Sequence, residues 1–408
     1  MNRVICDPDR CTGCAACREI CPKHCISMQK DSLDALHPVI DESLCIDCGG
    51  CTNTCPNNHK LIFCHSQKVW VAWSEDKDVR RSSASGGVAY ELYRHWLKNG
   101  GVAAGVTYTR EEGCHFILIE KEADIATVQN SKYTFSDTWD IYRVVKQKLQ
   151  AGIPVLFIAV PCQVAGLLCF LKKEYSNLTT VDLICHGMPP ATYLQQHIDS
   201  IESHTKEHTN SLFFRDPKYY TYTYTFTLKN KDGREFYKKK VLADDDYQLG
   251  YHKALIYREN CYSCNYARKE RISDLTIGDF CGLGNVEPVK YDTHNVSCIL
   301  QNTDKGATLL AEIGQSLTKY ERPANEAFDY EKQLRAPSLK HRCRALFETE
   351  YKKDKDFERA ADIALAEEKK NAIKQNRKIA VKNAIKCILP MTYIRRVKMA
   401  MRKNHGIK

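Results

Sequence analysis

The sequence predicts a protein of mixed α+β and α/β class in three parts: a cysteine-rich segment over residues 1–65, a larger α/β segment over 66–345, and a helical basic tail over 346–408. Three observations predict this organisation. A cysteine run is repeated near the N-terminus, apolar strands alternate with helices in the middle, and the last forty residues hold no acidic side chain. With 408 residues, 43% of them hydrophobic, the chain can bury cores for two or three domains.

The first part contains a cysteine run that occurs twice. The stretch "CTGCAACREICP" starts at Cys11, and "CIDCGGCTNTCP" repeats its internal spacing thirty-four residues later. This spacing is typical of bacterial ferredoxins with two [4Fe–4S] clusters, in which the fourth cysteine of each run ligates the cluster of the other run. Zinc knuckles are the alternative, but they usually need two local CxxC pairs for each metal. The predicted cages are Cys11, Cys14, Cys17 and Cys55, and Cys45, Cys48, Cys51 and Cys21.

Glycines and further cysteines accompany these runs. Gly13, Gly49 and Gly50 are expected to let the backbone turn tightly around a cluster. Three cysteines fall outside the repeated spacing, and we expect them to be small buried apolar side chains rather than ligands: Cys6, Cys25 and Cys64.

From residue 68 onward the pattern is that of an α/β protein. Strands are predicted in "VWVAW", "GVAAGVTY", "FILIE", "IPVLFIAV" and "LTTVDLICHG", and helices at about 87–98, in "WDIYRVVKQKLQAG" and in "PCQVAGLLCFLKK". This order predicts βαβ units, with "IPVLFIAV" buried on both faces of a parallel sheet. The alternating stretch "YYTYTYTFTLK" predicts a hairpin strand that places Tyr220, Tyr222 and Tyr224 on one face and turns at Asp232-Gly233.

Four further cysteines lie where a site could form. Cys162 and Cys185 each follow an apolar strand, so both are expected at the carboxyl ends of neighbouring strands, where open α/β sheets bind ligands. Cys261 and Cys264 form a CxxC pair in "NCYSCNYARKERISDLTIGDF". The spacing alone leaves three interpretations open: a third metal site, a redox pair, or buried structural cysteines.

The stretch "SSASGG", residues 82–87, opens a predicted helix with small hydroxyl residues and two glycines. Free backbone N–H groups and the helix dipole would face outward together there, which suits a phosphate or pyrophosphate. A serine-rich helix cap without a ligand explains the same stretch and is the more frequent case.

The basic character of the chain belongs to its tail. Residues 369–408 hold 13 of the 60 Lys and Arg and none of the 50 Asp and Glu, which leaves 47 basic and 50 acidic residues in the rest. The net charge of +10 therefore does not predict a nucleic-acid-binding body, and no nucleic-acid partner is expected. The tail is predicted to be a basic amphipathic helix, and two interpretations stay open: a solvated or partner-facing helix, and a helix that contacts an anionic membrane surface. Its predicted apolar face consists of Val381, Ile385, Ile388, Ile394, Val397 and Met401.

The remaining composition bounds the location. The longest apolar run, "GIPVLFIAV", is about half of what a membrane span needs, and the N-terminus has no apolar core of signal-peptide length. Twenty-one cysteines with CxxC runs fit metal thiolates in a reducing compartment better than disulfides. We therefore expect a cytoplasmic protein, with the tail as a candidate peripheral contact to the inner face of the membrane.

Five motifs in order carry a resemblance to a known family: "SSASGG", "QNSKYTFSD", "VPCQVAGLLCFLKK", "TVDLICHG" and "NCYSCNYARKERISDLTIGDF". Over about residues 1–340 the chain resembles the beta-subunit family of coenzyme F-420 hydrogenase/dehydrogenase, behind an N-terminal two-cluster ferredoxin domain. The resemblance implies a flavin-dependent oxidoreductase with FAD and a [4Fe–4S] cluster in the second part, and many bacterial relatives accompany surface-polysaccharide genes. It implies a third cluster on Cys162, Cys185, Cys261 and Cys264, and flavin contacts at Ser83, Ser85, Gly86, Gly87, Lys132 and Gln163.

Two functions follow as hypotheses. In the first, a redox donor protein such as a ferredoxin or a reductase charges the N-terminal clusters, and a flavin, which accepts single electrons and delivers pairs, reduces an organic small molecule. In the second, the chain is an electron-transfer subunit without its own substrate site and docks on a partner enzyme. The sequence names neither the acceptor nor a catalytic residue.

Overall fold

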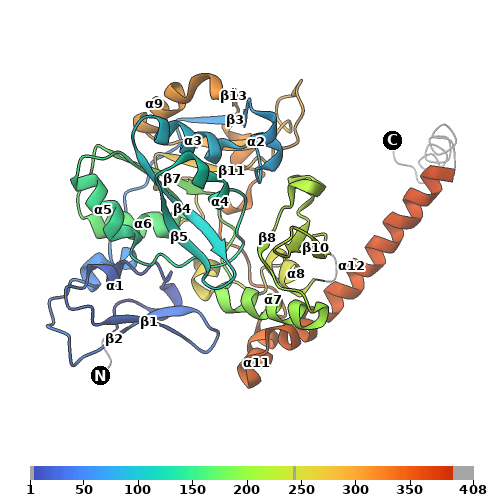
Figure 1. The fold of residues 1–408 in the computed structure, drawn as a ribbon, viewed down its shortest axis with the longest axis horizontal. Coiled ribbons are helices and arrows are strands. Elements are labelled where there is room, and N and C mark those ends of the chain that lie inside the picture. The colour runs from blue at the N-terminus through green and yellow to red at the C-terminus, as the bar shows by residue number, and fades with distance from the viewer. Residues whose placement is uncertain (1–3, 242–244, 389–408) are drawn as a thin grey trace.

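A computed structural model describes residues 4–241 and 245–388, with side chains up to residue 374 (Figure 1). The N-terminal segment folds as a small unit of one helix and one antiparallel hairpin, α1 (Ala16–Ile20), β1 (Ile26–Lys30) and β2 (Leu36–Ile40). The tip of this hairpin is hydrogen-bonded to residues that lie much later in the chain. Tyr193 OH donates to Leu33 O at 2.8 Å, and Tyr351 OH and Lys355 Nζ donate to the Asp34 carboxylate at 3.0 and 2.9 Å.

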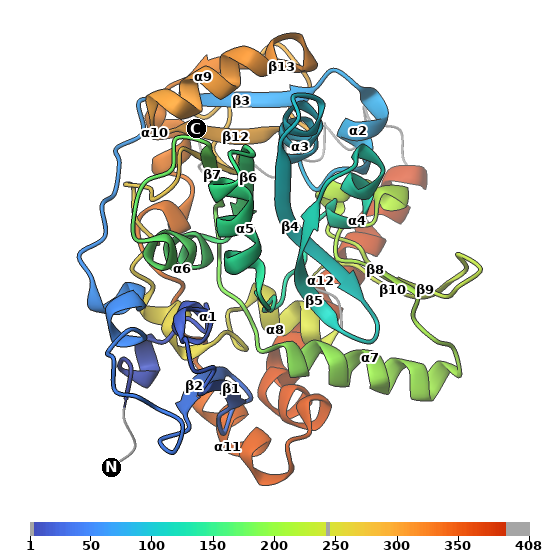
Figure 2. The same ribbon diagram turned by 60° about the vertical axis from the view of Figure 1, so that its left-hand side comes forward.

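An eight-stranded mixed sheet forms the centre of the molecule (Figure 2). Its strand order is β13-β3-β12-β11-β7-β6-β4-β5, in which β11, β7, β6 and β4 are parallel and the other pairs are antiparallel. The predicted βαβ arrangement is confirmed. The strands are β3 (Lys68–Ser74), β4 (Val102–Thr109), β5 (Gly113–Ile119), β6 (Val155–Ala159), β7 (Leu178–Leu183), β11 (Leu275–Asp279), β12 (Ser297–Gln301) and β13 (Leu317–Arg322).

Helices cover both faces of this sheet because its central strands are apolar on both sides. All five residues of β6 are buried: Leu156 and Ile158 pack with α3 and α9, whereas Val155, Phe157 and Ala159 pack with α5 and α6. Figure 2 shows α1 of the N-terminal segment directly below α6, and the two helices are in contact. The helices around the sheet are α2 (Lys77–Ser82), α3 (Val88–Lys98), α4 (Ile125–Val128), α5 (Ile141–Gln150), α6 (Pro161–Leu171), α9 (Asp304–Ile313) and α10 (Ala324–Phe328).

A second core forms where a three-stranded antiparallel sheet meets four helices. Phe347 and Tyr351 of α11, and Phe357 and Leu365 of α12, are fully buried there beside the sheet residue Phe226. The second half of α12 extends away from the body (Figure 1). The elements are β8 (Ser211–Phe213), β9 (Phe226–Lys229), β10 (Glu235–Lys239), α7 (Ala191–Thr205), α8 (Asp246–His252), α11 (Arg344–Asp354) and α12 (Phe357–Ile388).

The proposed apolar face of the tail lies mostly beyond what the structure describes. Val381, Ile385 and Ile388 belong to α12 but follow the last described side chain, and Ile394, Val397 and Met401 lie outside the described residues. No helix within the described ranges is long and apolar enough to cross a membrane.

The predicted tyrosine strand is wrong. Residues 217–219 and 221–223 form short 3-10 turns, and the strand begins only at Phe226. Tyr220 and Tyr224 have φ values of 63° and 50°, which breaks the alternation. Tyr224 is instead held by tertiary contacts, because its hydroxyl donates to Asp279 Oδ2 at 2.6 Å and the Arg215 guanidinium lies 4.2 Å from its ring centre. The predicted turn of the hairpin is present, with Gly233 at φ 72° between β9 and β10.

His197 joins α7 to the C-terminal helix through a buried charge cluster. Its Nε2 lies 3.0 Å from Asp245 Oδ2 and its Nδ1 lies 2.6 Å from Glu358 Oε1. Burial alone would lower the pKa of His197, but the two carboxylates outweigh it and raise the pKa from 6.5 to about 10. A raised folded-state pKa means that protonated His197 stabilises the fold fully below the unfolded value and progressively less as the pH rises through the folded one.

We therefore expect the free energy of unfolding to fall between about pH 7 and pH 10, and His197→Gln to lower it by about 3 kcal/mol near pH 6.5 and to flatten that decline. Urea unfolding at several pH values measures this effect. His204→Gln, on the exposed side of the same helix, serves as the control. An unchanged slope of stability against pH in His197→Gln would contradict the assignment.

Candidate functional site

The two cysteine runs begin with the same pattern of backbone turns. The second and fourth residues after the first cysteine of each run have positive φ: Gly13 and Ala15 at 68° and 58°, and Asp47 and Gly49 at 56° and 67°. Two residues in each run therefore occupy the left-handed region, in which glycine is favoured. Gly13 and Gly49 meet the expectation of tight turns, whereas Gly50 has no positive φ.

The structure gathers the first predicted cage. Burial raises the pKa of Cys14 to about 12, and the charges of Cys11 and Cys55 add to this. Burial also raises the pKa of Cys17, and the charges of Cys14, Cys11 and Cys55 add to this increase. All four side chains of this set, which we call the inner cage, are buried: Cys11, Cys14, Cys17 and Cys55.

The second predicted cage is more open. Cys21 is buried, Cys45 and Cys51 are half-buried, and Cys48 is exposed. We call Cys21, Cys45, Cys48 and Cys51 the outer cage. Two of the extra cysteines lie beside the cages: Cys25 Sγ is 3.4 Å from Cys21 Sγ, and a hydrogen bond from Cys6 lowers the pKa of Cys11 to about 4.

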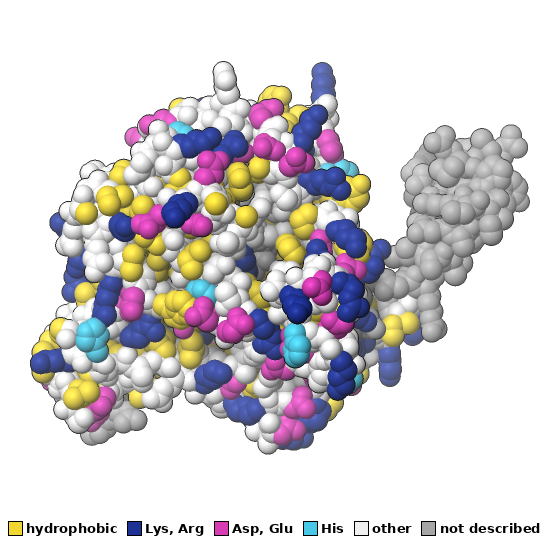
Figure 3. Space-filling model, viewed as in Figure 1, with side chains coloured by type: hydrophobic (Ala, Val, Ile, Leu, Met, Phe, Trp, Pro, Cys, Tyr) yellow, Lys and Arg dark blue, Asp and Glu magenta, His cyan; other side chains and the backbone are white. Residues whose placement is uncertain are grey.

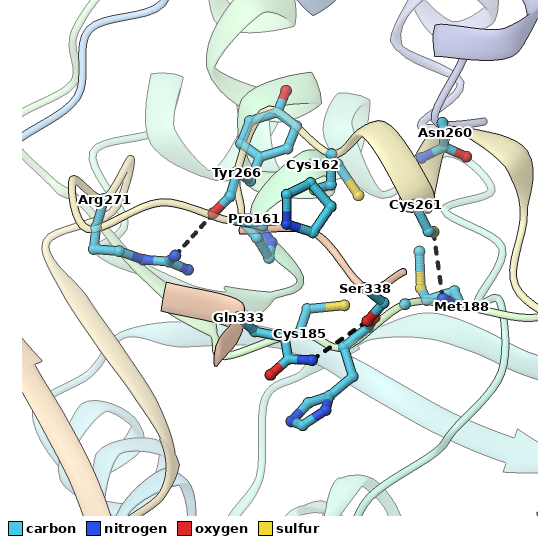
Figure 4. Close-up of a pocket in the computed structure, with 15 residues that line it drawn as sticks. Pro161, Cys162, Cys185, Met188, Asn260, Cys261, Tyr266, Arg271, Gln333 and Ser338 are labelled. Carbon is cyan, nitrogen blue, oxygen red and sulfur yellow. Dashed lines mark hydrogen bonds between the residues drawn. The ribbon is translucent and has the colours of Figure 1, made fainter. Parts of the chain in front are cut away.

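The four remaining candidate cysteines line one hollow, although they come from three separate segments (Figure 4). Because β6 and β7 are parallel neighbours, paired from Val155 with Leu178 to Ala159 with Asp182, the residues that follow them reach the same edge of the sheet. Cys162 opens α6 directly after β6, and Cys185 follows β7. Cys261 and Cys264 reach this edge on a 3-10 turn over Glu259–Ser263.

A buried ion pair fastens the CxxC segment to the sheet. Arg271 Nη2 donates to Asp182 Oδ1 at 2.9 Å. Figure 4 shows the second bond of this side chain, in which Arg271 Nη1 donates to Tyr266 O at 2.9 Å. The Asp182 side chain is completely buried on β7. The backbone of Arg271 also exchanges two hydrogen bonds with Cys64, of 2.7 and 2.8 Å, so the chain that leaves the N-terminal segment is held at the same point.

Backbone N–H groups point at the sulfurs of this hollow. The Met188 N–H donates to Cys261 Sγ at 3.4 Å. The Gly187 N–H donates to the sulfur of Cys185, and the N–H groups of Tyr266 and Ala267 donate to that of Cys264. Burial raises the pKa of all four thiols, that of Cys261 to about 11. Cys162 and Cys261 are buried and Cys185 and Cys264 are half-buried. Four thiols around one hollow, with N–H donors to sulfur, are the ligand set and surroundings that a [4Fe–4S] cluster uses. Among the described residues, no group of three or more His, Cys, Asp or Glu is arranged to hold a single metal ion.

The inner cage lies against the helix that carries Cys162. A methyl group added to Gly166 would lie 3.1 Å from Cys14 Sγ and 2.7 Å from Tyr142 OH. Cys162 and Gly166 are four residues apart on α6, so they share one face of the helix about 6 Å apart along its axis. Burial raises the pKa of the Tyr266 hydroxyl, and the charges of Cys162 and Cys14 raise it further. Tyr266 therefore lies near both cysteines.

The predicted flavin contacts divide into two groups. Ser83 and Lys132 lie beside one loop, because Gln129 Nε2 donates to Ser83 Oγ at 3.0 Å and Lys132 Nζ donates to Gln129 O at 2.8 Å. Burial lowers the pKa of Lys132 to about 8, and within the described residues no carboxylate pairs with it. Gly87, at φ 86°, begins α3 without a side-chain cap. An unpaired cation and free helical N–H groups fit a phosphate.

The other predicted flavin contacts are engaged within the protein. Ser85 Oγ lies 2.8 Å from Ser297 Oγ, and the Gly86 N–H donates to the same oxygen at 2.9 Å. A methyl group on Gly86 would lie 2.3 Å from the Ala72 carbonyl oxygen, so this glycine permits close packing on β3 and β12. Gln163 Nε2 donates to Ser136 O at 2.9 Å, on α6 next to Cys162.

A polar cluster that the sequence did not single out lies at the same edge of the sheet. Asp279 ends β11 and accepts from Arg215 Nη1 at 3.0 and 2.8 Å and from the Tyr224 hydroxyl. Asn130 Nδ2 donates to Arg215 O at 2.9 Å, which connects this cluster to the loop of Lys132. The "GDF" within the quoted motif contains Asp279, but its partners are 55 and 64 residues away in sequence.

Two family models cover more than half of the chain. Residues 69–142 match the N-terminal model of the coenzyme F420 hydrogenase/dehydrogenase beta subunit, and residues 154–326 match the model of its C terminus. The chain belongs to the coenzyme F420 hydrogenase/dehydrogenase beta-subunit family. Residues 10–59 match the 4Fe-4S dicluster domain, so this beta-subunit family member carries an iron–sulfur electron-transfer domain of the ferredoxin type.

Curated relatives match this beta-subunit family member over short segments. The NADH-quinone oxidoreductase subunit I of Pelobacter propionicus is 39% identical over 57 residues, which are 12% of this chain and 31% of that protein. An uncharacterized ferredoxin of Methanocaldococcus jannaschii is 34% identical over 59 residues, 14% of this chain and 75% of that protein. A solved structure of the F420-reducing [NiFe] hydrogenase complex from Methanosarcina barkeri aligns with a TM-score of 0.43 and 16% identity, over 66% of this chain and 91% of that one.

Proposed function

We propose that this protein is an iron–sulfur flavoprotein oxidoreductase. In this proposal a low-potential donor protein, such as a ferredoxin or a reductase, supplies electrons to the two ferredoxin clusters. A third [4Fe–4S] cluster on Cys162, Cys185, Cys261 and Cys264 and a bound FAD connect them to an organic acceptor. We also propose a role in surface-polysaccharide biosynthesis, and this part rests on the family resemblance alone.

One observation carries the proposal. Cys14 of the inner cage touches α6 at Gly166, one helical turn from Cys162 and on the same helix face. The hollow with four thiols therefore adjoins the inner cage rather than lying elsewhere in the molecule. A family member that only stored electrons in its N-terminal domain would have no use for a second set of buried thiols at this point.

The side chains and backbone around the hollow suit a bound cluster that transfers electrons. Besides the thiols, the hollow is lined by apolar residues such as Pro161 and Met188 and by polar ones such as Asn260 and Gln333, so hydrogen-bonding groups as well as apolar surface surround the sulfurs. The N–H groups of Met188 and Gly187 donate toward sulfur, which stabilises negative charge there. A flavin, when bound, supplies a carrier that takes electrons singly and releases them as a pair. Lys132 and the first turn of α3 are the groups that would hold its phosphates.

The proposal is tested by cofactor content. Purified without oxygen, the full chain should contain about twelve irons, the number that three [4Fe–4S] cages hold, together with flavin absorbance. Iron and acid-labile sulfide analysis combined with the visible spectrum measure both. A preparation with about eight irons and no flavin would refute the central site.

The second candidate function is an electron-transfer subunit without a substrate site of its own. It is favoured by the predicted flavin contacts Ser85, Gly86 and Gln163, whose polar groups already bond within the protein. Turnover of a low-potential donor with small-molecule acceptors by the isolated chain supports the enzyme. Activity that appears only with a co-purifying subunit supports the relay.

The location of the protein is proposed as cytoplasmic, with the basic tail as a peripheral membrane contact. On the face drawn in Figure 3, basic and acidic side chains are interspersed over the body, so the excess of positive charge in the tail sets it apart. Anionic lipids attract such segments. Co-sedimentation with anionic liposomes, compared between the full chain and one lacking residues 370–408, tests this contact, and equal binding refutes it.

A further inference from the structure

Arg258 is one of the largest fully buried side chains of the protein, with 2% of its surface exposed. It lies three residues before Cys261, yet its guanidinium reaches the N-terminal segment. Nη2 donates to the carbonyl oxygens of Cys11 and Leu36 at 3.3 and 3.0 Å, and a methyl group on Gly13 would lie 2.8 Å from Nη2. The guanidinium is therefore packed against the loop that carries the first two ligands of the inner cage.

This buried cation has no carboxylate partner among the described residues. Its Nε donates to the neutral Asn260 Oδ1 at 3.4 Å, the Phe135 ring centre lies 4.9 Å away, and Nη1 is buried without any hydrogen-bond partner. The neighbouring Glu259 pairs with Lys340 instead. An arginine remains charged in proteins, and a buried unpaired charge is strongly unfavourable, so a nearby anion is required.

Arg271, the other fully buried arginine near these cysteines, shows the contrast. Its charge is matched by Asp182 at 2.9 Å, and its remaining N–H groups find carbonyl and hydroxyl oxygens. Both arginines lie beside the thiols of the central hollow, but only Arg258 also contacts the inner cage. The hydrogen bonds of its Nη2 run to the Cys11 and Leu36 carbonyls, on the side of the inner cage.

We propose that Arg258 is the buried counter-charge of the inner cage, and that it raises the reduction potential of the cluster held by Cys11, Cys14, Cys17 and Cys55. Four thiolates make a ligated cluster an anion, and reduction adds one more negative charge to it. A fixed positive charge nearby stabilises the reduced form more than the oxidised form. Among the described residues the outer cage lacks this contact, so the effect of the Arg258 charge falls on the inner cluster.

The inference rests on the clusters of the proposed function, but it needs only those of the ferredoxin domain. The test is a redox titration of the full-length holoprotein, followed by electron paramagnetic resonance. Cys48→Ser, which alters the exposed ligand of the outer cage, identifies the outer signal. Arg258→Gln should lower the ratio of reduced to oxidised inner cluster at a given potential about tenfold or more, which is a shift of about 59 mV or more to lower potential. Arg258→Lys should stay close to the wild type.

Matched variants separate charge from packing. Arg110→Gln removes one positive charge at a distant ion pair with Glu202 and should shift neither potential. Asn260→Asp keeps the arginine and its hydrogen bonds but places a carboxylate at Nε, so it should shift the inner potential in the same direction as Arg258→Gln. This variant serves as the test where Arg258→Gln does not assemble its clusters.

Two results would overturn the proposal: an inner potential that is unchanged in Arg258→Gln or Asn260→Asp with both ferredoxin clusters present, or equal shifts in Arg258→Lys and Arg258→Gln. Iron content is recorded for every sample. A wild-type chain with eight irons refutes the central cluster but leaves this inference testable, so the two failures are distinguishable.

Discussion

Replacing Cys261 with serine is expected to remove the central cluster and leave the two ferredoxin clusters in place. A serine hydroxyl is a poor substitute for a soft thiolate as a ligand of iron. Iron content should fall from about twelve to about eight per chain, and electron delivery from a low-potential donor to the acceptor should fall by about 100-fold or more. Iron analysis and steady-state turnover under anaerobic conditions measure the two effects.

The matched control is Cys298→Ser. Cys298 is as deeply buried as Cys261, but it lies on β12 in a separate apolar cluster with Val69 and Leu300. It should retain all three clusters and most of the activity. If Cys261→Ser keeps its full iron content, or if both variants lose iron equally, the assignment of Cys261 as a ligand is wrong.

Replacing Asp182 with alanine should produce the largest loss of stability. Removing one partner of a buried ion pair leaves the other charge uncompensated, which typically costs about 3–5 kcal/mol. In this variant the charge left without a partner is that of Arg271, which also donates hydrogen bonds to the Tyr266 carbonyl and the Thr276 hydroxyl. The free energy of unfolding, from urea titration with an unchanged slope against urea concentration, measures the loss. The segment with Cys264 should loosen at the same time, so bound iron should fall.

The control for this prediction is Asp199→Ala. Asp199 also pairs with an arginine, Arg110, but its side chain is 54% exposed. Surface ion pairs contribute between about 0 and 1 kcal/mol, so this variant should unfold close to the wild type. A loss below about 1 kcal/mol in Asp182→Ala would show that the Arg271 charge finds other compensation.

The sequence predicted the parts of the site that depend on local spacing. The cysteine runs specify their own turns, and positive φ at Gly13 and Gly49 follows from the demand of a chain that must wrap closely around a cage. The meeting of Cys162 with Cys185 was predictable as well. Both follow apolar strands, and the strands of a βαβ unit are parallel, so their carboxyl ends share an edge.

The parts that escaped prediction depend on contacts between distant segments. Arg258 donates to the Cys11 carbonyl although the two residues are 247 positions apart in sequence, and no periodic pattern in the sequence predicts such a contact. The tyrosine stretch had the alternation of a strand, but Arg215 and Asp279 bind Tyr224 and override the local preference. The same holds for Lys132, whose carbonyl partners are set by the shape of its loop.

The anchoring of the N-terminal hairpin at Leu33 and Asp34 has a kinetic consequence. A free ferredoxin must find its partner by diffusion, and its rate of electron delivery depends on the concentration of both proteins. Here the ferredoxin domain is a fixed part of the molecule. Electron transfer from it within the chain would therefore be a first-order step, whose rate does not depend on protein concentration. Cys48 of the outer cage is exposed, so we expect an external donor to deliver electrons by collision at that side.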